Sequence, residues 1–482
     1  MQSSVIDDES PVCTDRQSKR HSNHEERSPL LADRQSPDLS MLTSDDNVTV
    51  INPSGSRSYG SGRYKFTGCW AAVFLTVNAC IGAGILNVSQ VFDKSGSLLI
   101  SFIIESILLV FITGSLFILS YCVDLSGVDN FQNVVKYFCG DFWAKVCSYF
   151  IVLHAYGVCL TFLVIIGDQS DRLLTSLYGS DFCHYWYMNR NFTIPIIATA
   201  LVLPLCFSKY IDFLKYPSSG GLAVIIYILF LIVHEYSEHH VPDAHINTLL
   251  PENWSSISIV VPVICFAYQC HLSWVPTYAR MQQNFSSTKL WITIIGSILI
   301  CVISYSWAIV FGILTFGSGK LDTDLMKNYD PNEKVVLIGI LCLIFKTVTT
   351  YPLLLFCARI AIDKWIQNLT RDLVPEPKRR ALIVLIWFMS TLVISTTLPD
   401  IGLIIDLVGT LAVTFIFIFP GMCLKGTLKI AKDPRKRLKN TFINIVAMIY
   451  VLLGVFVFIL SLIQWINNDF IKERDRDPPL CT

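Results

Sequence analysis

The chain has 482 residues, of which 53% are hydrophobic and only 15% charged, and its mean hydropathy is +0.53. This composition is too apolar for a soluble enzyme of such length and indicates a polytopic membrane protein. The formal net charge is zero, and the sequence has no basic stripe of the kind that binds nucleic acid.

The first 65 residues differ in composition from the rest of the chain. They are rich in Ser, Asp, Arg and Pro and almost free of aromatic residues, so we expect residues 1–65 to form a disordered cytosolic tail. No apolar segment precedes residue 66, which argues against a cleavable signal peptide. Glu26, Leu30 and Leu31 fit the acidic dileucine pattern that adaptor proteins bind when they sort proteins to lysosomes. A chance match is the alternative interpretation of this motif.

Eleven apolar spans follow, and roughly 20 residues suffice for a helix to cross a bilayer. Their approximate limits are 66–92, 97–122, 143–167, 192–207, 217–234, 256–274, 290–315, 334–358, 381–397, 399–423 and 441–466. We therefore expect an all-α membrane domain of eleven helices at 66–466 and a short non-cytosolic tail at 467–482. A cytosolic N-terminus places most Lys and Arg of the connecting loops on the inner side, as the positive-inside rule requires. Two glycosylation sequons, at Asn191 and Asn253, then fall on the outer side.

The first span is a poor helix at its centre. Gly82 and Gly84 each cost about 1 kcal/mol relative to Ala in a helix interior. Asn78 and Asn87 bring polar groups to a depth where hydrocarbon offers no partner. A helix that breaks there exposes backbone groups, which is tolerated where they line a cavity and can bind a solute or an ion. A close-packing face of small residues is the alternative.

Span six is irregular in a similar way, because it contains Pro262, Gln269 and His271. Spans one to five and six to ten have opposite predicted topology, and the first span of each half is the irregular one. Interrupted segments at matching positions of inverted halves point to a transporter's binding site at mid-membrane. The sequence thus predicts a 5+5 inverted repeat with broken helices one and six, and an eleventh helix outside the repeat.

Oxygen atoms suited to a hard cation gather at two places. Asn78 offers a side-chain oxygen at the break of span one. In span eight, Thr349 and Thr350 come just before Pro352, which frees a carbonyl one turn earlier. Hydrogen bonding of these hydroxyls back to their own helix is the alternative.

The end of the first half of span six is placed to meet a small polar solute. Phe266, Ala267 and Gln269 would face such a solute if the helix breaks there. For Phe266, simple packing is an equal alternative.

Ionisable residues within spans are costly and are therefore functional candidates. They include Glu105, His154, His271, Lys346 and Asp406. In one interpretation Glu105 and Lys346 form a structural ion pair, and in another either histidine carries a proton. For each histidine, a structural role is favoured.

Motifs of enzymes are missing from the sequence. It contains no serine triad, no paired carboxylates at a membrane face, no zinc-ligand spacing and no phosphate-binding Walker loop. We therefore expect no enzymatic activity and no cofactor apart from a co-transported Na⁺ or H⁺. Its 16 cysteines are interpreted mainly as small core residues.

Several segments in order resemble the amino acid/auxin permease family, and within it the sodium-coupled neutral amino acid transporters, including a lysosomal member. The segments are 77–87, 165–169, 264–271, 314–317 and 419–424. The resemblance covers about 66–466 and implies a leucine-transporter-type fold that exports glutamine, asparagine or similar amino acids from the lysosome.

The resemblance also implies positions for both binding sites. Its cation site would fall on Asn78 and on Thr349 or Thr350, with Na⁺ held at Asn78 and Thr350. Its substrate site, at the two broken helices, would fall on residues already singled out: Gly82, Ala83, Gly84 and the region of Phe266. Glu105, Lys346 and Asp406 stand outside the family's pattern, so the coupling ion stays open.

Taken together, these features predict a secondary active transporter of neutral amino acids in the lysosomal or plasma membrane. The alternative is an amino-acid sensor that signals through its cytosolic tail. A passive channel is disfavoured, because no ring of like charges or repeated filter motif is present.

Overall fold

The structure is a computed structural model, and the chain separates into two compact units, Met1–Tyr64 and Lys65–Thr482. The described residues are 49–51, 57–59, 68–179, 185–207, 212–241, 251, 254–281, 286–370, 375–397, 401–430 and 437–470. The dileucine motif at Glu26, Leu30 and Leu31 lies outside them, as does Asn253.

The first unit contains two short strands, β1 (Thr49–Ile51) and β2 (Arg57–Tyr59). They pair antiparallel, with Thr49 opposite Tyr59. Among the described residues, these are the only two β-strands. The remainder of the predicted tail is outside the described residues, so its disorder stays a prediction.

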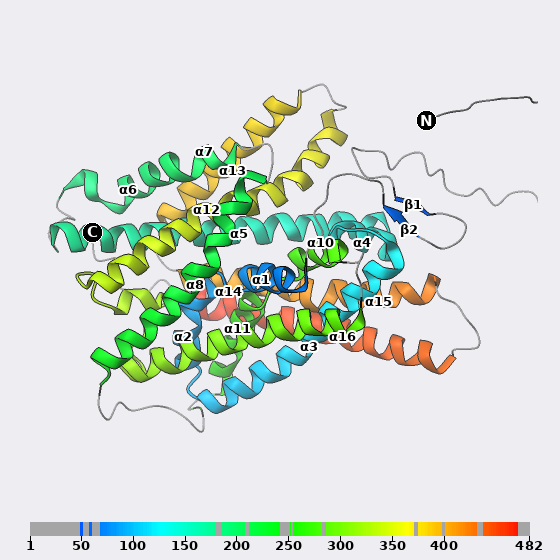
Figure 1. The fold of residues 1–482 in the computed structure, drawn as a ribbon, viewed down its shortest axis with the longest axis horizontal. Helices are drawn as coiled ribbons and strands as arrows, with labels where there is room; N and C mark the ends of the chain where they lie inside the picture. The colour runs from blue at the N-terminus through cyan, green and yellow to red at the C-terminus, as the bar shows by residue number, and fades with distance from the viewer. Residues whose placement is uncertain are drawn as a thin grey trace, which may run out of the picture. The chain divides into compact units, whose positions relative to one another are not determined.

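The second unit is helical (Figure 1). Its α-helices are α1 (Cys69–Cys80), α2 (Gly84–Lys94), α3 (Leu98–Ser126), α4 (Phe131–Cys139), α5 (Asp141–Tyr178), α6 (Arg190–Ile197), α7 (Leu203–Cys206), α8 (Asp212–His239), α9 (Val260–Ala267), α10 (His271–Met281), α11 (Ser287–Phe316), α12 (Lys334–Thr370), α13 (Glu376–Thr397), α14 (Ile401–Val413), α15 (Phe419–Ile430) and α16 (Arg437–Gln464). Short 3₁₀ turns lie at Trp186–Met188, Trp254–Ile259 and Leu325–Asn328, and π-helical turns at Ala198–Val202, Thr414–Ile418 and Trp465–Phe470.

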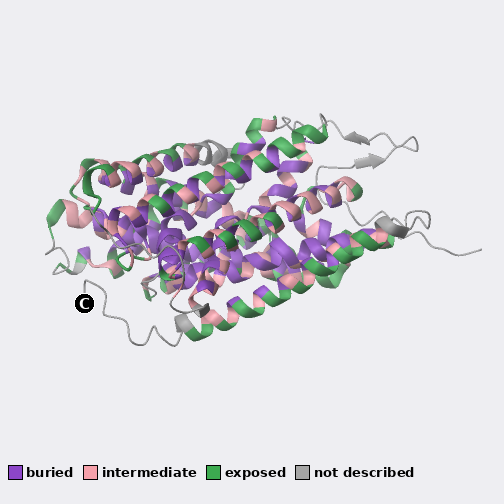
Figure 2. Ribbon diagram, turned by 90° about the horizontal axis from the view of Figure 1, so that it is seen from below, coloured by how far each residue is buried: buried purple, intermediate pink, exposed green. Residues whose placement is uncertain are grey.

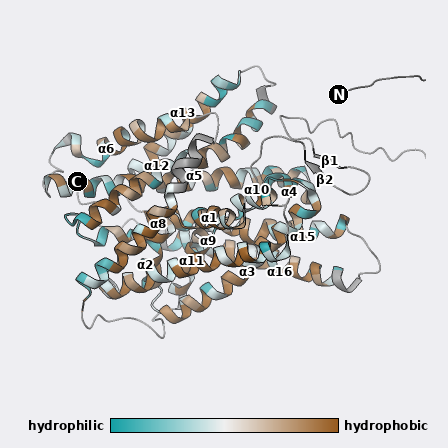
Figure 3. Cartoon of the chain, viewed as in Figure 1, coloured by the Kyte–Doolittle hydropathy of each residue, from teal (hydrophilic) through white to brown (hydrophobic). Residues whose placement is uncertain are grey.

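Long apolar helices dominate this unit (Figure 3). Within the described residues, nine segments are long and apolar enough to cross a membrane, and α1 with α2 makes a tenth if the bent pair is one span. The predicted fourth span corresponds to a shorter apolar segment, Arg190–Cys206. A multi-pass membrane protein is therefore confirmed, whereas the count of eleven and the 5+5 repeat stay predictions.

The breaks expected in spans one and six are both present. Residues 81–83 are non-helical between α1 and α2, whose axes differ by 57°. Residues 268–270 are likewise non-helical between α9 and α10. The local sequence explains the first break, because Gly82 adds little helix propensity and has no Cβ to restrict its backbone.

Burial shows which helices form the centre of the unit. In the most apolar window of α5, and also of the α14–α15 segment, 72% of residues are buried, against 28% for α16. Figure 2 shows the buried residues gathered along the inner helices, with exposed residues on the outer faces. The broken helix α9 packs against α14, and α14 packs against α5. The second break therefore lies in the interior of the helical unit, as a binding site would require.

Candidate functional site

The two breaks meet where α2 packs against α9. Gly84 is the first residue of α2, and a Cβ built on it would lie 3.2 Å from the Cα of Ala267, the last residue of α9. The same Cβ would be 3.6 Å from Cδ1 of Phe266. Glycine at position 84 thus lets the start of one half-helix touch the end of another.

One hydroxyl group contacts both breaks. Tyr305, from α11, is fully buried, and its hydroxyl oxygen lies 3.0 Å from the carbonyl oxygen of Cys80 and 2.9 Å from that of Ala267. These are the terminal carbonyls of α1 and α9, which lack partners within their own helices. A hydroxyl has one proton, so Tyr305 shares one donor between the two carbonyls.

The next carbonyl of the first break is bound by a lysine side chain. Lys346, from α12, donates a hydrogen bond from Nζ to the carbonyl oxygen of Ile81, and its side chain is buried. The suggested ion pair between Glu105 and Lys346 is wrong. The Glu105 carboxylate instead accepts a hydrogen bond of 2.6 Å from the hydroxyl of Tyr268, a residue of the second break.

The predicted cation ligands lie on two different helices, Asn78 on α1 beside the first break and the two threonines on α12. Asn78 belongs to the last turn of α1, and a Cβ built on Gly221 of α8 would lie 2.6 Å from its Oδ1. The Thr349 hydroxyl donates to the carbonyls of Phe345 and Lys346, each at 3.0 Å. The Thr350 hydroxyl also donates to the Lys346 carbonyl, at 2.7 Å. Both threonines therefore make the helix-internal bonds given above as the alternative, while each hydroxyl oxygen can still accept a ligand.

The predicted substrate residues all lie in or beside the two breaks. Gly82 and Ala83 are within the first, and Gln269 is within the second. In the described part of the chain, the amides of Ala83, Gly84 and Ile85 have no backbone acceptor. They form the N-terminus of α2, where amide dipoles favour an anion.

Of the other ionisable candidates, His271 directly follows the second break as the first residue of α10, while His154 and Asp406 belong to α5 and α14. Nε2 of His271 is hydrogen-bonded to the Ser115 hydroxyl, and the ring of His154 packs edge-on against that of Phe415. These contacts agree with the structural roles favoured for both histidines. Asp406 is half-buried on α14.

The segment between α11 and α12 binds the far end of α2, which sequence reasoning missed. The side-chain amide of Asn87 donates to the carbonyl of Thr323 at 3.1 Å. The carboxylate of Asp93 accepts from the amide of Gly319 at 2.7 Å. Gly319 has φ +84°, a left-handed conformation that glycine adopts without strain. From the sequence alone, Asn87 was recognisable only as a polar residue within an apolar span.

The same segment is also bound to α5. Asp324 accepts a hydrogen bond of 2.7 Å from the side-chain amide of Gln169, and Lys327 forms an ion pair of 3.1 Å with Asp168. Burial and the neighbouring Asp168 carboxylate raise the pKa of Asp324 to about 6. We call segment 317–333 the outer segment, because the predicted topology places it on the non-cytosolic side. In this structure the outer segment contacts both α2 and α5 through these hydrogen bonds and this ion pair.

Comparisons with known proteins fit this arrangement. A family model described as transmembrane amino acid transporter protein matches residues 65–467. Sodium-coupled neutral amino acid transporter 7 of Danio rerio is 33% identical over 444 residues, which cover 90% of this chain and 94% of the relative. The protein of the same name from Homo sapiens is 33% identical over 368 residues, covering 74% and 79%. Solute carrier family 38 member 8 of Homo sapiens is 31% identical over 400 residues, covering 80% and 91%.

A solved structure has the same fold. The crystal structure of MhsT in complex with L-phenylalanine superposes with a TM-score of 0.53 at 11% sequence identity, covering 82% of this chain and all of that one. At this identity the likeness concerns the fold alone, and it agrees with the leucine-transporter-type fold predicted from the sequence.

Proposed function

The chain belongs to the transmembrane amino acid transporter family and resembles its sodium-coupled neutral amino acid transporters, and from that premise we propose that it moves glutamine, asparagine and similar neutral amino acids by alternating access. Transport is driven by a Na⁺ or H⁺ gradient. The observation that carries the proposal is the meeting of two interrupted helices, with Gly84 of α2 against Ala267 of α9.

This meeting point has complementary groups for both charges of an amino acid. The amides of Ala83, Gly84 and Ile85 would receive the α-carboxylate at the positive end of α2. Carbonyl groups at the end of α9 would receive the α-amino group, at the negative end of that half-helix. Phe266 and Gln269 are the proposed contacts for the rest of the substrate.

Two ions fit the first break in different ways. Na⁺ would take oxygen ligands from Asn78 and from Thr349 or Thr350. A coupled proton would instead reside on Lys346, because an ionisable group buried at membrane depth is costly unless it functions there. Either gradient can supply the free energy for transport. Moving one charge across the membrane releases roughly 2.3 kcal/mol per 100 mV, and moving one proton releases about 1.4 kcal/mol per pH unit.

Alternating access requires that the site open to one side at a time. The outer segment is bound to α2 through Asn87 and Asp93, which supports a state closed on the non-cytosolic side. Release of these bonds would accompany opening toward that side. We propose the lysosomal membrane as the location, on the strength of Glu26, Leu30 and Leu31, with the plasma membrane as the alternative.

The test is exchange of labelled glutamine across liposomes that contain the purified full-length protein. We expect saturable exchange that unlabelled asparagine inhibits and that Gly84→Leu abolishes, because a leucine side chain cannot fit against Ala267. If glutamine binds saturably but no exchange occurs, the sensor interpretation replaces transport. Deleting residues 1–60 would then remove signalling and leave binding intact.

A further inference from the structure

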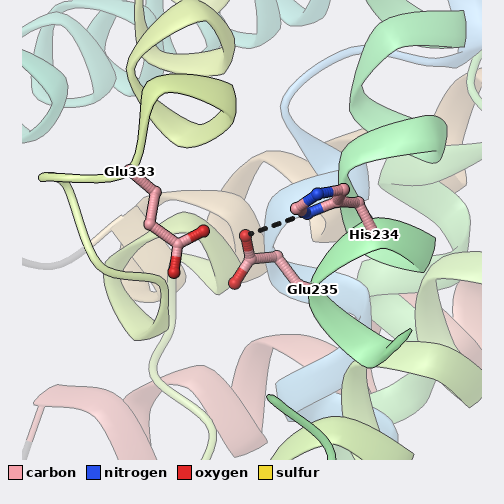
Figure 4. Close-up of side chains that lie close together, drawn as sticks. All are labelled: His234, Glu235 and Glu333. Carbon is pink, nitrogen blue, oxygen red and sulfur yellow. Dashed lines mark ion pairs between the residues drawn. The ribbon is translucent and has the colours of Figure 1, made fainter. Parts of the chain in front are cut away.

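A cluster of imidazole and carboxylate groups joins the end of α8 to the start of α12 (Figure 4). His234 and Glu235 lie in the last turns of α8, and Glu333 immediately precedes α12. One ligand atom from each of the three lies within 4.8 Å of the others. The cluster is distant in sequence from the two helix breaks and has no part in the function proposed above.

Two atoms of this cluster are buried without hydrogen bonds. Within the described part of the chain, Nδ1 of His234 and Oε1 of Glu235 have no hydrogen-bond partner. They face each other at 3.8 Å, which is too long for a hydrogen bond. The Glu235 residue is 2% exposed, and a buried carboxylate oxygen without a partner is costly.

The separation of these atoms suits a metal ion between them. Zn²⁺ binds imidazole nitrogen and carboxylate oxygen at about 2.0–2.2 Å, so two such ligands are separated by roughly 3–4.4 Å. A mixed nitrogen and oxygen set favours Zn²⁺ over Ca²⁺ or Mg²⁺, which prefer oxygen alone.

A second histidine lies close to one oxygen of each carboxylate. Nδ1 of His239 lies 3.5 Å from Oε2 of Glu235, and its Nε2 lies 3.2 Å from Oε1 of Glu333. An imidazole that contacts both carboxylates orients them, as groups around a metal centre commonly do. Oε1 of Glu235 thus faces His234, and Oε2 faces His239.

We propose that His234, Glu235 and Glu333 form a Zn²⁺ site, with His239 as a positioning residue. The bound ion connects α8 to the outer segment before α12 and stabilises the arrangement in which they lie together. In the predicted topology this site is on the non-cytosolic side, where it would respond to Zn²⁺ in the lysosomal lumen or outside the cell.

The test uses purified full-length protein stripped with a chelator. Titration calorimetry with Zn²⁺ should show one site per chain, and the unfolding temperature should rise when Zn²⁺ is added. His234→Gln and Glu333→Gln should each weaken Zn²⁺ binding at least about tenfold. His240→Ala is the matched control, because it removes an imidazole just beyond the end of α8. Among the interactions described, the ring of His240 contacts the backbone oxygen and the ring of Tyr236, and not the three proposed ligands.

Three results would overturn the site. They are the absence of Zn²⁺ binding by the unaltered chain, binding that survives both substitutions, and binding that Ca²⁺ displaces at equal concentration. Binding through thiols elsewhere would survive both substitutions and so count against the proposal. Glu333 is partly exposed and precedes its helix, so Glu333→Gln decides the matter if His234→Gln does not fold.

Discussion

The side-chain amino group of Lys346 donates a hydrogen bond to the carbonyl oxygen of Ile81, the residue at which the first span stops being helical. The amino group of Lys346 therefore already binds a carbonyl that the break sets free. A metal cation bound at the first break, as proposed above, would compete with Lys346 for this carbonyl.

Lys346→Met should remove the amino group while keeping most of the length of the side chain. The Ile81 carbonyl would lose its donor, a change that costs about 1–3 kcal/mol for a buried group. We expect uptake of glutamine to fall and its dependence on the imposed ion gradient to change. Lys364→Met, at an exposed position of the same helix, is the control. Unchanged ion dependence in Lys346→Met would show that this residue has no part in coupling.

Tyr305→Phe should separate folding from transport. The substitution removes the one donor shared by the carbonyls of Cys80 and Ala267, and so loosens both breaks together. We expect at least about a tenfold loss of uptake, corresponding to 1.4 kcal/mol or more, with retention of the folded chain on size-exclusion chromatography. Tyr450→Phe removes a hydroxyl that donates to the Phe111 carbonyl at 2.8 Å, away from the breaks, and should retain uptake. Equal losses in the two variants would argue against a special role for Tyr305.

Gly409→Ala tests the close contact between α14 and α9. An added Cβ would lie 2.1 Å from the Pro262 carbonyl oxygen, so the two helix backbones must move apart. Overpacking of this kind costs typically 1–3 kcal/mol, and we expect a lower unfolding temperature. Gly296→Ala is matched to it, since its Cβ would meet only Val73 at 3.9 Å and should be neutral or stabilising. The contact is unimportant if both variants unfold at the temperature of the unaltered chain.

The stability of the outer segment should depend on pH through Asp324. Burial and Asp168 raise the pKa of the Asp324 carboxyl from 3.8 to about 6, while Lys327 and Arg172 oppose the shift. Between these two values the folded chain binds more protons than the unfolded chain, so this group's contribution to stability falls as pH rises from about 4 to about 6. The full effect is on the order of 3 kcal/mol at most.

Hydrogen-exchange protection of residues 317–333 measures this dependence. Protection, corrected for the intrinsic exchange rate, should be greater at pH 5 than at pH 7 in the unaltered chain. In Asp324→Asn the difference should shrink, because asparagine does not titrate but can still accept from the Met326 amide. An equal pH difference in both proteins would assign it to another group.

The sequence predicted the breaks well because they depend on local chemistry. Gly82 and Gly84 weaken the first span wherever it packs, and Pro262 and Gln269 mark the second as irregular. Residues at both breaks were therefore found without knowledge of the fold. The partners of the breaks were not, because Tyr305 and Lys346 lie far away in the chain.

The missed and incorrect predictions have the same cause, because they all concern contacts between residues that lie far apart in the sequence. Tyr305 in an apolar span has the pattern of an ordinary core residue, and no spacing rule connects it with Cys80 or Ala267. Glu105 and Lys346 were paired because opposite charges in a membrane attract, yet each has a closer partner in the structure. The cluster at His234, Glu235 and Glu333 joins two segments that only the fold brings together.

The most direct test of the whole account is uptake of labelled glutamine into liposomes under separately imposed Na⁺ and pH gradients, with Asn78→Ala measured alongside. The account predicts uptake that follows one of the gradients in the unaltered chain. If that gradient is Na⁺, Asn78→Ala should lose the dependence. If it is the proton gradient, Asn78→Ala should keep the dependence and Lys346→Met should lose it. Saturable glutamine binding that neither gradient converts into uptake would contradict a transport function.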